Sequence, residues 1–161
     1  MKFKGLNIQK ARNRIMPDND YLKYWRVIRY WVKATYDVGT PDLEMLLFLY
    51  SEQIFNKSKF AEFNELMSWD EKRFRMLLRD GWIHVWRKRN GKEATLYELT
   101  YKAKRMINNV YKKLNGEEIP EVTNPLFRHD ASYMDKVFKN YIKKLNKTIK
   151  NKRLCIITPS L

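Results

Sequence analysis

A change of hydrophobic period in the middle of the chain most constrains its fold. Upstream, apolar residues recur three and four positions apart, whereas residues 82–88 and 94–99 alternate apolar and polar side chains. Asn90 and Gly91 lie between these two runs and predict a tight hairpin turn. A helical pattern resumes after Thr100, which is a good helix cap. The sequence therefore predicts a mainly α protein with one small β-hairpin.

Four helices are expected upstream of the hairpin, from capping residues and apolar spacing. The last two are short and meet across a sharp turn, where Ser68 and Glu71 have the spacing of a capping box. Such a pair is typical of a helix-turn-helix. The expected helices run from Asp18 or Asp20 to about Val38, from Thr40 to about Phe55, from Ser58 through Leu66, and from Ser68 to Asp80.

The charge balance indicates a polyanionic partner. Lys and Arg number 33 against 18 Asp and Glu, which gives a net charge of +15. Such an excess destabilises a folded chain through self-repulsion and favours binding to nucleic acid. Double-stranded DNA is the expected partner. An anionic membrane is the less favoured alternative, because no long stretch combines a basic face with a clean apolar one. No apolar run of eighteen residues is present that could span a membrane.

Two groups of cations are candidates for contact with DNA. In the helix before the hairpin, Phe74, Leu77 and Leu78 share one face, which leaves a basic opposite face; an ordinary solvated surface is the alternative there. The hairpin is also basic, since four of the seven residues at positions 87–93 are Lys or Arg. The candidates are Lys72, Arg73, Arg75, Met76 and Arg79 in the helix, and Arg87, Lys88, Arg89 and Lys92 in the hairpin.

The stretch LLRDGWIHVWRKRNGKEATLYELTYKAKRMI, residues 77–107, combines a leucine-rich helix end, a Gly, a basic hairpin and a returning strand that ends in Leu-Thr. In this order the chain resembles, over residues 20–116, the MarR family of winged-helix transcription regulators. The resemblance implies a winged helix-turn-helix whose N- and C-terminal helices form a dimer platform. It also implies a recognition helix in the major groove and a basic wing on the DNA backbone or in the minor groove. The family wing usually holds Asp-x-Arg near its tip, where this chain has Asn90-Gly91-Lys92 and a shorter loop. The chain also has Ala103 at a position where Gly is common in the family.

The region after residue 116 predicts a linker followed by a basic amphipathic helix. The helix is expected from Asp130 or Ser132 to about Lys150, and the last eight residues form a short β-prone piece. Dimerisation would cover the apolar stripe of this helix, and folding back on its own domain is the alternative. The expected dimer residues are Trp25, Ile28, Trp31, Val32, Phe138, Tyr141 and Leu145. The expected division of the chain is a basic arm at 1–17, a winged-helix domain at 18–116, a linker at 117–129, and the C-terminal helix and tail at 130–161.

No catalytic centre is expected. The chain has one cysteine, Cys155, and two histidines, His84 and His129, which are too few for a zinc site. None of the five glycines belongs to a phosphate-binding loop. We therefore expect no enzyme activity, no metal and no cofactor.

The leading functional hypothesis is a dimeric transcription regulator that is cytoplasmic or nucleoid-associated. A single cysteine fits a reducing compartment. A fold does not determine a role, so two alternatives stay open. One is a structural or interaction component, such as a viral virion or nucleoprotein protein, that reuses the winged helix and would be located in the virion. The other is a winged helix that binds RNA.

Overall fold

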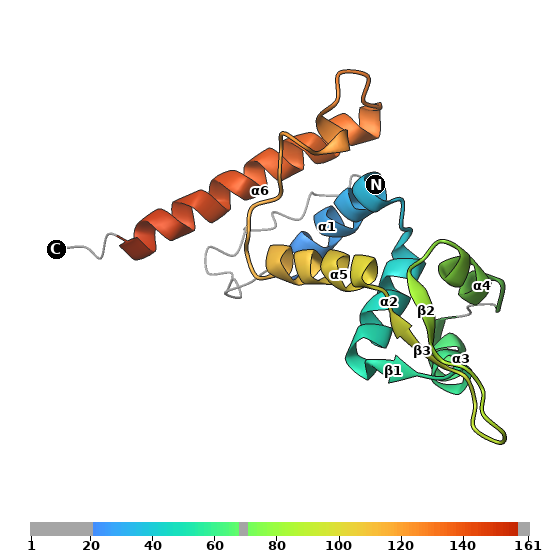
Figure 1. Cartoon of the computed structure of the whole chain (residues 1–161). Coiled ribbons are helices and arrows are strands. Elements are labelled where there is room, and N and C mark those ends of the chain that lie inside the picture. The colour runs from blue at the N-terminus through green and yellow to red at the C-terminus, as the bar shows by residue number, and fades with distance from the viewer. Residues whose placement is uncertain (1–20, 68–70, 158–161) are drawn as a thin grey trace, which may run out of the picture.

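The computed structural model describes residues 21–67 and 71–157, and it is mainly helical with one small sheet (Figure 1). The order from α2 to β3 is that of a winged helix-turn-helix, in which α3 and α4 are the helix pair and β2–β3 is the wing. The predicted fold class is therefore confirmed. The elements are α1 (Tyr21–Tyr36), α2 (Thr40–Glu52), β1 (Ile54–Phe55), α3 (Lys57–Met67), α4 (Glu71–Arg79), β2 (Ile83–Arg87), β3 (Leu96–Leu99), α5 (Tyr101–Leu114), the 3-10 helix η1 (Pro125–Phe127) and α6 (Tyr133–Ile157).

The sheet has a third strand that the sequence analysis placed in a helix. Its order is β1-β3-β2, and Ile54 of β1 pairs antiparallel with Glu98 of β3. The prediction that the second helix continues to Phe55 was wrong. Gln53 has a φ of 60°, which ends α2 and turns the chain toward β3. Pairing with β3 then satisfies backbone groups that a longer helix would have bonded internally.

The hairpin turn lies one residue later than expected. The amide of Asn90 donates to the carbonyl of Glu93 at 3.3 Å, and the amide of Glu93 donates to the carbonyl of Asn90 at 3.0 Å. The two central residues are therefore Gly91 and Lys92. Gly91 has a φ of 55°, a conformation that a side chain disfavours. The strands are also shorter than predicted, and their register is irregular after Val85.

Two helix starts agree with the sequence and two differ. We expected Thr40 to cap α2, but Thr40 is the first residue of that helix and Gly39 is its cap, without a side-chain hydrogen bond. The Thr100 hydroxyl accepts a hydrogen bond from the Ala103 amide at 3.3 Å and caps α5, as predicted. Ser132 caps α6, since its hydroxyl accepts from the amide of Asp135 at 3.2 Å. The cap of α3 is Asn56 instead of Ser58, because only a residue before the first turn can bond its free amides. The predicted caps Ser68, Asp18 and Asp20, and the basic arm, lie outside the described residues.

The wing and α4 share a core of aromatic side chains. Phe74 of α4 meets the ring of Phe60 from α3 and the ring of Tyr97 from β3, both edge to face, at centroid distances of 4.6 and 5.0 Å. Leu77 is also buried in this core. This packing orients α4 so that its opposite side faces solvent.

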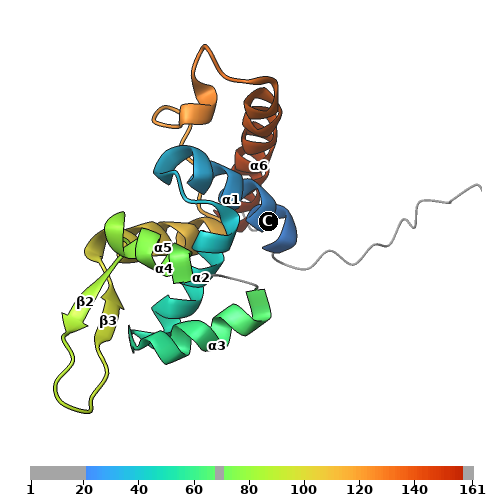
Figure 2. The same ribbon diagram turned by 90° about the vertical axis from the view of Figure 1, so that its right-hand side faces the viewer.

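The C-terminal helix folds back on α1 of the same chain. The rings of Tyr30 and Phe138 stack with centroids 3.7 Å apart, and the Tyr30 hydroxyl donates to Asp135 Oδ1 at 3.0 Å. Figures 1 and 2 show α6 across α1 at the end of the molecule away from the wing. None of the helices among the described residues is long and apolar enough to span a membrane.

Residues 117–129, which we expected to be a linker, pack between α1 and α6. Buried Asn146 of α6 accepts a hydrogen bond from the Ile119 amide at 3.0 Å and donates to the Ile119 carbonyl at 2.9 Å. Leu126 of η1 is buried as well. The segment therefore contributes to the core.

The expectation of a β-prone end was wrong for residues 154–157, which continue α6. Arg153 Nη1 lies 3.4 Å from Oε1 of Glu118, in the segment that follows α5. This contact supports the helix beyond Lys150. Residues 158–161 lie outside the described part of the chain.

Candidate nucleic-acid interface

The exposed face of α4 contains most of the helix cations that the periodicity predicted. Phe74 and Leu77 are buried on the inner side, at 1% and 4% exposure. The residues on the outer side are Lys72, Arg75, Met76 and Arg79. A helix of this kind presents long cationic side chains that can reach the edges of bases or phosphates.

Two of the five helix candidates are engaged in ion pairs. Arg73 Nη1 lies 3.2 Å from Asp42 Oδ1, so this side chain connects α4 to α2. Arg79 Nε lies 2.8 Å from Asp80 Oδ1, and this hydrogen bond raises the pKa of Arg79. Lys72 and Arg75 form no ion pair with a described residue. Among the described residues, neither side chain has an acid within ion-pair distance.

The four cations of the wing are all exposed. Arg87 forms a cross-strand ion pair with Glu93, with Nη2 and Oε2 2.9 Å apart. Arg89 Nε donates to the carbonyl of Gly91 at 3.2 Å, and Lys88 and Lys92 form no ion pair with a described residue. Residues 87–93 of the wing therefore contain four cations and one acid, Glu93.

Lys57, at the start of α3, connects the wing to α4. It lines a cavity together with Arg89 and Lys92 of the wing. Its Nζ also lies 3.0 Å from Oε1 of Glu71, the first residue of α4, and this hydrogen bond lowers the pKa of Glu71. Cations beside the turn of the wing and the starts of both helices therefore belong to one basic surface.

Lys57 of this surface was not predicted from the sequence, and neither was Trp86, which lies beside the wing cation Arg87. Trp86 lies in β2 and is 49% exposed, with the Arg87 guanidinium 5.9 Å from its ring centroid. A large aromatic side chain left exposed beside cations is a common feature of nucleic-acid contacts. Its position just before the four wing cations was the available signal. For Lys57 the sequence held no signal, because its partners are distant in the chain.

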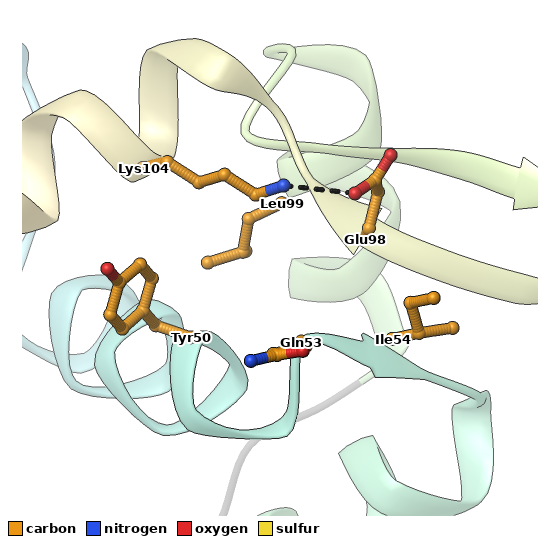
Figure 3. Close-up of a pocket in the computed structure, with 6 residues that line it drawn as sticks. All are labelled: Tyr50, Gln53, Ile54, Glu98, Leu99 and Lys104. Atoms are coloured by element: carbon orange, nitrogen blue, oxygen red, sulfur yellow. Dashed lines mark hydrogen bonds and ion pairs between the residues drawn. The ribbon is translucent and has the colours of Figure 1, made fainter.

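A second cavity lies on the other side of the sheet, between α2, β3 and α5 (Figure 3). Lys104 Nζ lies 3.0 Å from Glu98 Oε2, and His84 Nε2 lies 2.9 Å from Glu98 Oε1. The hydrogen bonds from Lys104 and His84 lower the pKa of Glu98. The cluster ties β2 and β3 to α5, and none of the predicted site residues lines the cavity.

The seven expected dimer residues divide into two groups. Ile28, Trp31, Val32 and Leu145 are at most 3% exposed, so the core of one chain already covers the side chains that we expected at a dimer contact. Their apolar spacing reflects packing within one chain, where α1 contacts both α5 and α6. Trp25 and Phe138 are partly buried, and Tyr141 is 52% exposed.

The described residues contain no group of three or more His, Cys, Asp or Glu side chains that could hold a metal ion. Cations outnumber acids on the candidate surface, where Glu71 and Glu93 are each paired with a cation. Cationic groups bind anions.

Comparison with solved structures finds two crystal structures of MarR from E. coli. The reduced form covers 82% of this chain and 97% of its own, with 14% sequence identity and a TM-score of 0.46. The oxidized form covers 82% and 95%, with 13% identity and a TM-score of 0.43. No protein-family model and no curated protein sequence matches the chain.

Proposed function

We propose that the protein is a winged-helix DNA-binding protein that regulates transcription. The observation that carries the proposal is the continuity of the basic surface, in which Lys57 lies beside the wing cations and pairs with the first residue of α4. A duplex placed on this surface meets α4 and the wing together.

In this proposal α4 enters the major groove. Arg75 has the planar fork that recognises guanine, and Lys72 lies near the helix start. Met76 can contact the methyl group of thymine, since it is exposed between these cations. Arg73 is removed from the predicted set, because Asp42 holds it against α2.

The wing supplies affinity without reading sequence. Lys88, Arg89 and Lys92 project from an exposed hairpin, and Arg87 is released for phosphate when its pair with Glu93 opens. Each phosphate contact releases condensed counterions, so binding through the wing depends strongly on salt. Contacts to phosphate set the register of the protein on DNA.

A homodimer is part of the proposal, with a contact that keeps Phe138 and Tyr141 of the expected set. A groove between α1 and α6 is lined by Val27, Met134, Phe138 and Tyr141. Trp25 belongs to the same helix as Val27 and is partly buried. A second copy of the chain would cover this groove and place two recognition helices on one duplex.

Selection from random duplexes, followed by two variants, tests the proposal. Arg75→Ala should weaken binding to the selected sequence by about 1–3 kcal/mol and affect random DNA much less, because base edges differ between sequences. Neutralising Arg87, Lys88, Arg89 and Lys92 should weaken binding to all duplexes alike and lower the salt slope by roughly one for each lost contact. Arg105→Ala, an exposed change on α5, is the control. If no sequence is enriched and both variants act equally, the protein is not a sequence-specific regulator.

A further inference from the structure

The lysines of α6 form a continuous face that the proposed function does not use. The helix carries eight Lys or Arg and one Asp, so it contributes +7 of the net charge of +15. At 3.6 residues per turn, six of the lysines fall within an arc of about 140° and extend over about 21 Å of helix. These six residues, which we call the lysine face, are Lys136, Lys139, Lys143, Lys144, Lys147 and Lys150.

The orientation of this face is set by the opposite side of the helix. Ile142, Leu145 and Ile149 are at most 4% exposed and belong to the core. Asn146, which bonds to the backbone of Ile119, further restricts rotation of the helix. The lysine face therefore points away from the body of the protein, and five of its six residues are exposed.

Most of the charge on this face is uncompensated. Lys150 Nζ lies 3.4 Å from Glu118 Oε2, and Lys139 Nζ lies 5.3 Å from the ring centroid of Phe127. The other four lysines form no ion pair with a described residue. Four neighbouring cations on one face repel one another, and a polyanion would relieve this repulsion.

The lysine face is separate from the surface formed by α4 and the wing. Figures 1 and 2 show α6 at one end of the molecule and the wing at the other. A duplex bound to α4 and the wing therefore leaves the lysine face open to a second ligand.

We propose that the lysine face is a second nucleic-acid-binding surface, which holds the phosphate backbone of another duplex segment without reading its sequence. A length of 21 Å of duplex axis carries about 12 phosphate charges, enough for all six lysines. Lysine binds phosphate as a point charge and lacks the fork that reads guanine. An anionic membrane is a poorer ligand, because membrane-surface helices insert an apolar side, and the core occupies that side here.

A bridging experiment tests this inference on the full chain. One short duplex is fixed to beads, a second labelled duplex is free in solution, and the protein is added to capture the second on the first. The test variant changes Lys136, Lys143, Lys144 and Lys147 to Gln. The control variant removes the same charge from scattered exposed positions, Lys33, Arg105, Lys112 and Arg128, also by change to Gln.

We expect the test variant to lose at least ten-fold in capture while it binds one short duplex within about three-fold of the unchanged protein. The control variant should capture normally. Circular dichroism checks that α6 stays helical. A variant with only Lys143→Gln and Lys147→Gln should show an intermediate loss of capture.

A second arm separates this inference from the proposed function. When Arg87, Lys88, Arg89 and Lys92 are neutralised, the remaining duplex binding should fall about 100-fold between 50 and 200 mM salt, as for four phosphate contacts. Adding the lysine-face changes should remove most of this salt-dependent binding and leave only the contacts of α4. A dimer that bridges two duplexes through its two wings would lose capture when the wing cations are neutralised and keep it when the lysine face is changed.

Capture that persists in the lysine-face variant would overturn the inference. The inference would also be overturned if the lysine-face variant lost binding to vesicles of anionic lipid but kept duplex capture, since the lysine face would then bind a membrane.

Discussion

The Nζ atom of Lys57 lies 3.0 Å from Oε1 of Glu71, and this contact joins the first residues of the two helices in the helix-turn-helix. Because Lys57 also lines a cavity with two cations of the wing, it is the point where the two halves of the basic surface meet. Glu71 pairs with Lys57, which would otherwise be available to a phosphate of DNA bound as proposed.

Opposite changes at this pair should therefore alter DNA affinity in opposite directions. Lys57→Gln removes a cation and should weaken binding to every duplex. Glu71→Gln frees Lys57 and should strengthen it. Titration of a fluorescent duplex measures both, and the melting temperatures should stay close to that of the unchanged protein because the pair is exposed. A parallel loss of affinity in both variants would show that the pair only supports the fold.

A charge placed in the groove between α1 and α6 should shift the protein from dimer to monomer. Tyr141 is 52% exposed in one chain, so Tyr141→Glu leaves the monomer fold intact and places a carboxylate in the proposed contact. Sedimentation at micromolar concentration should show the change in mass. Tyr101→Glu, at a position 81% exposed on α5, is the matched control and should remain a dimer. A monomeric unchanged protein would contradict the proposed contact.

Loss of the Asn146 amide should destabilise the C-terminal half of the protein. Asn146 is 3% exposed and bonds both backbone groups of Ile119. In Asn146→Ala these buried groups lose their partner, which should cost about 2–4 kcal/mol of unfolding free energy. Chemical denaturation measures the loss. Asn140→Ala, an exposed change on the same helix, should have little effect. Equal stability of the two variants would mean that Ile119 finds other partners.

Stability should depend on the charge of Glu98 at low pH. Hydrogen bonds from Lys104 and His84 lower the pKa of Glu98 in the folded protein. Its contribution is therefore present above its unfolded pKa, roughly 4.3, and is lost as pH falls through the lower folded value. Glu98→Gln should reduce the unfolding free energy at pH 7 by about 1 kcal/mol or less, because the carboxylate is partly exposed.

The difference between Glu98→Gln and the unchanged protein should shrink below about pH 4.3. Denaturation curves across this range test the sign. A difference that is constant with pH would show that the charge of Glu98 does not contribute.

Local signals in the sequence were sufficient for the elements that carry the candidate surface. The change of period around residue 90 predicted the hairpin, because alternation and helical spacing are properties of a few adjacent residues. Thr100 was recognised as a cap from its place before an apolar period, and its hydrogen bond spans three residues. The exposed side of α4 followed from the spacing of Phe74 and Leu77.

Contacts between distant residues decided what local pattern could not. Strand β1 exists because Ile54 pairs with Glu98, and two residues are too few to show a strand period. Arg73 is held by Asp42, thirty-one positions away, so its place in the sequence could not reveal that it is engaged. For α6, the apolar stripe indicated that something covers it. The pairing of Tyr30 with Asp135 and the packing of Ile142, Leu145 and Ile149 in the core show that the same chain covers part of the stripe. An amphipathic period shows that a helix needs a partner but does not identify that partner.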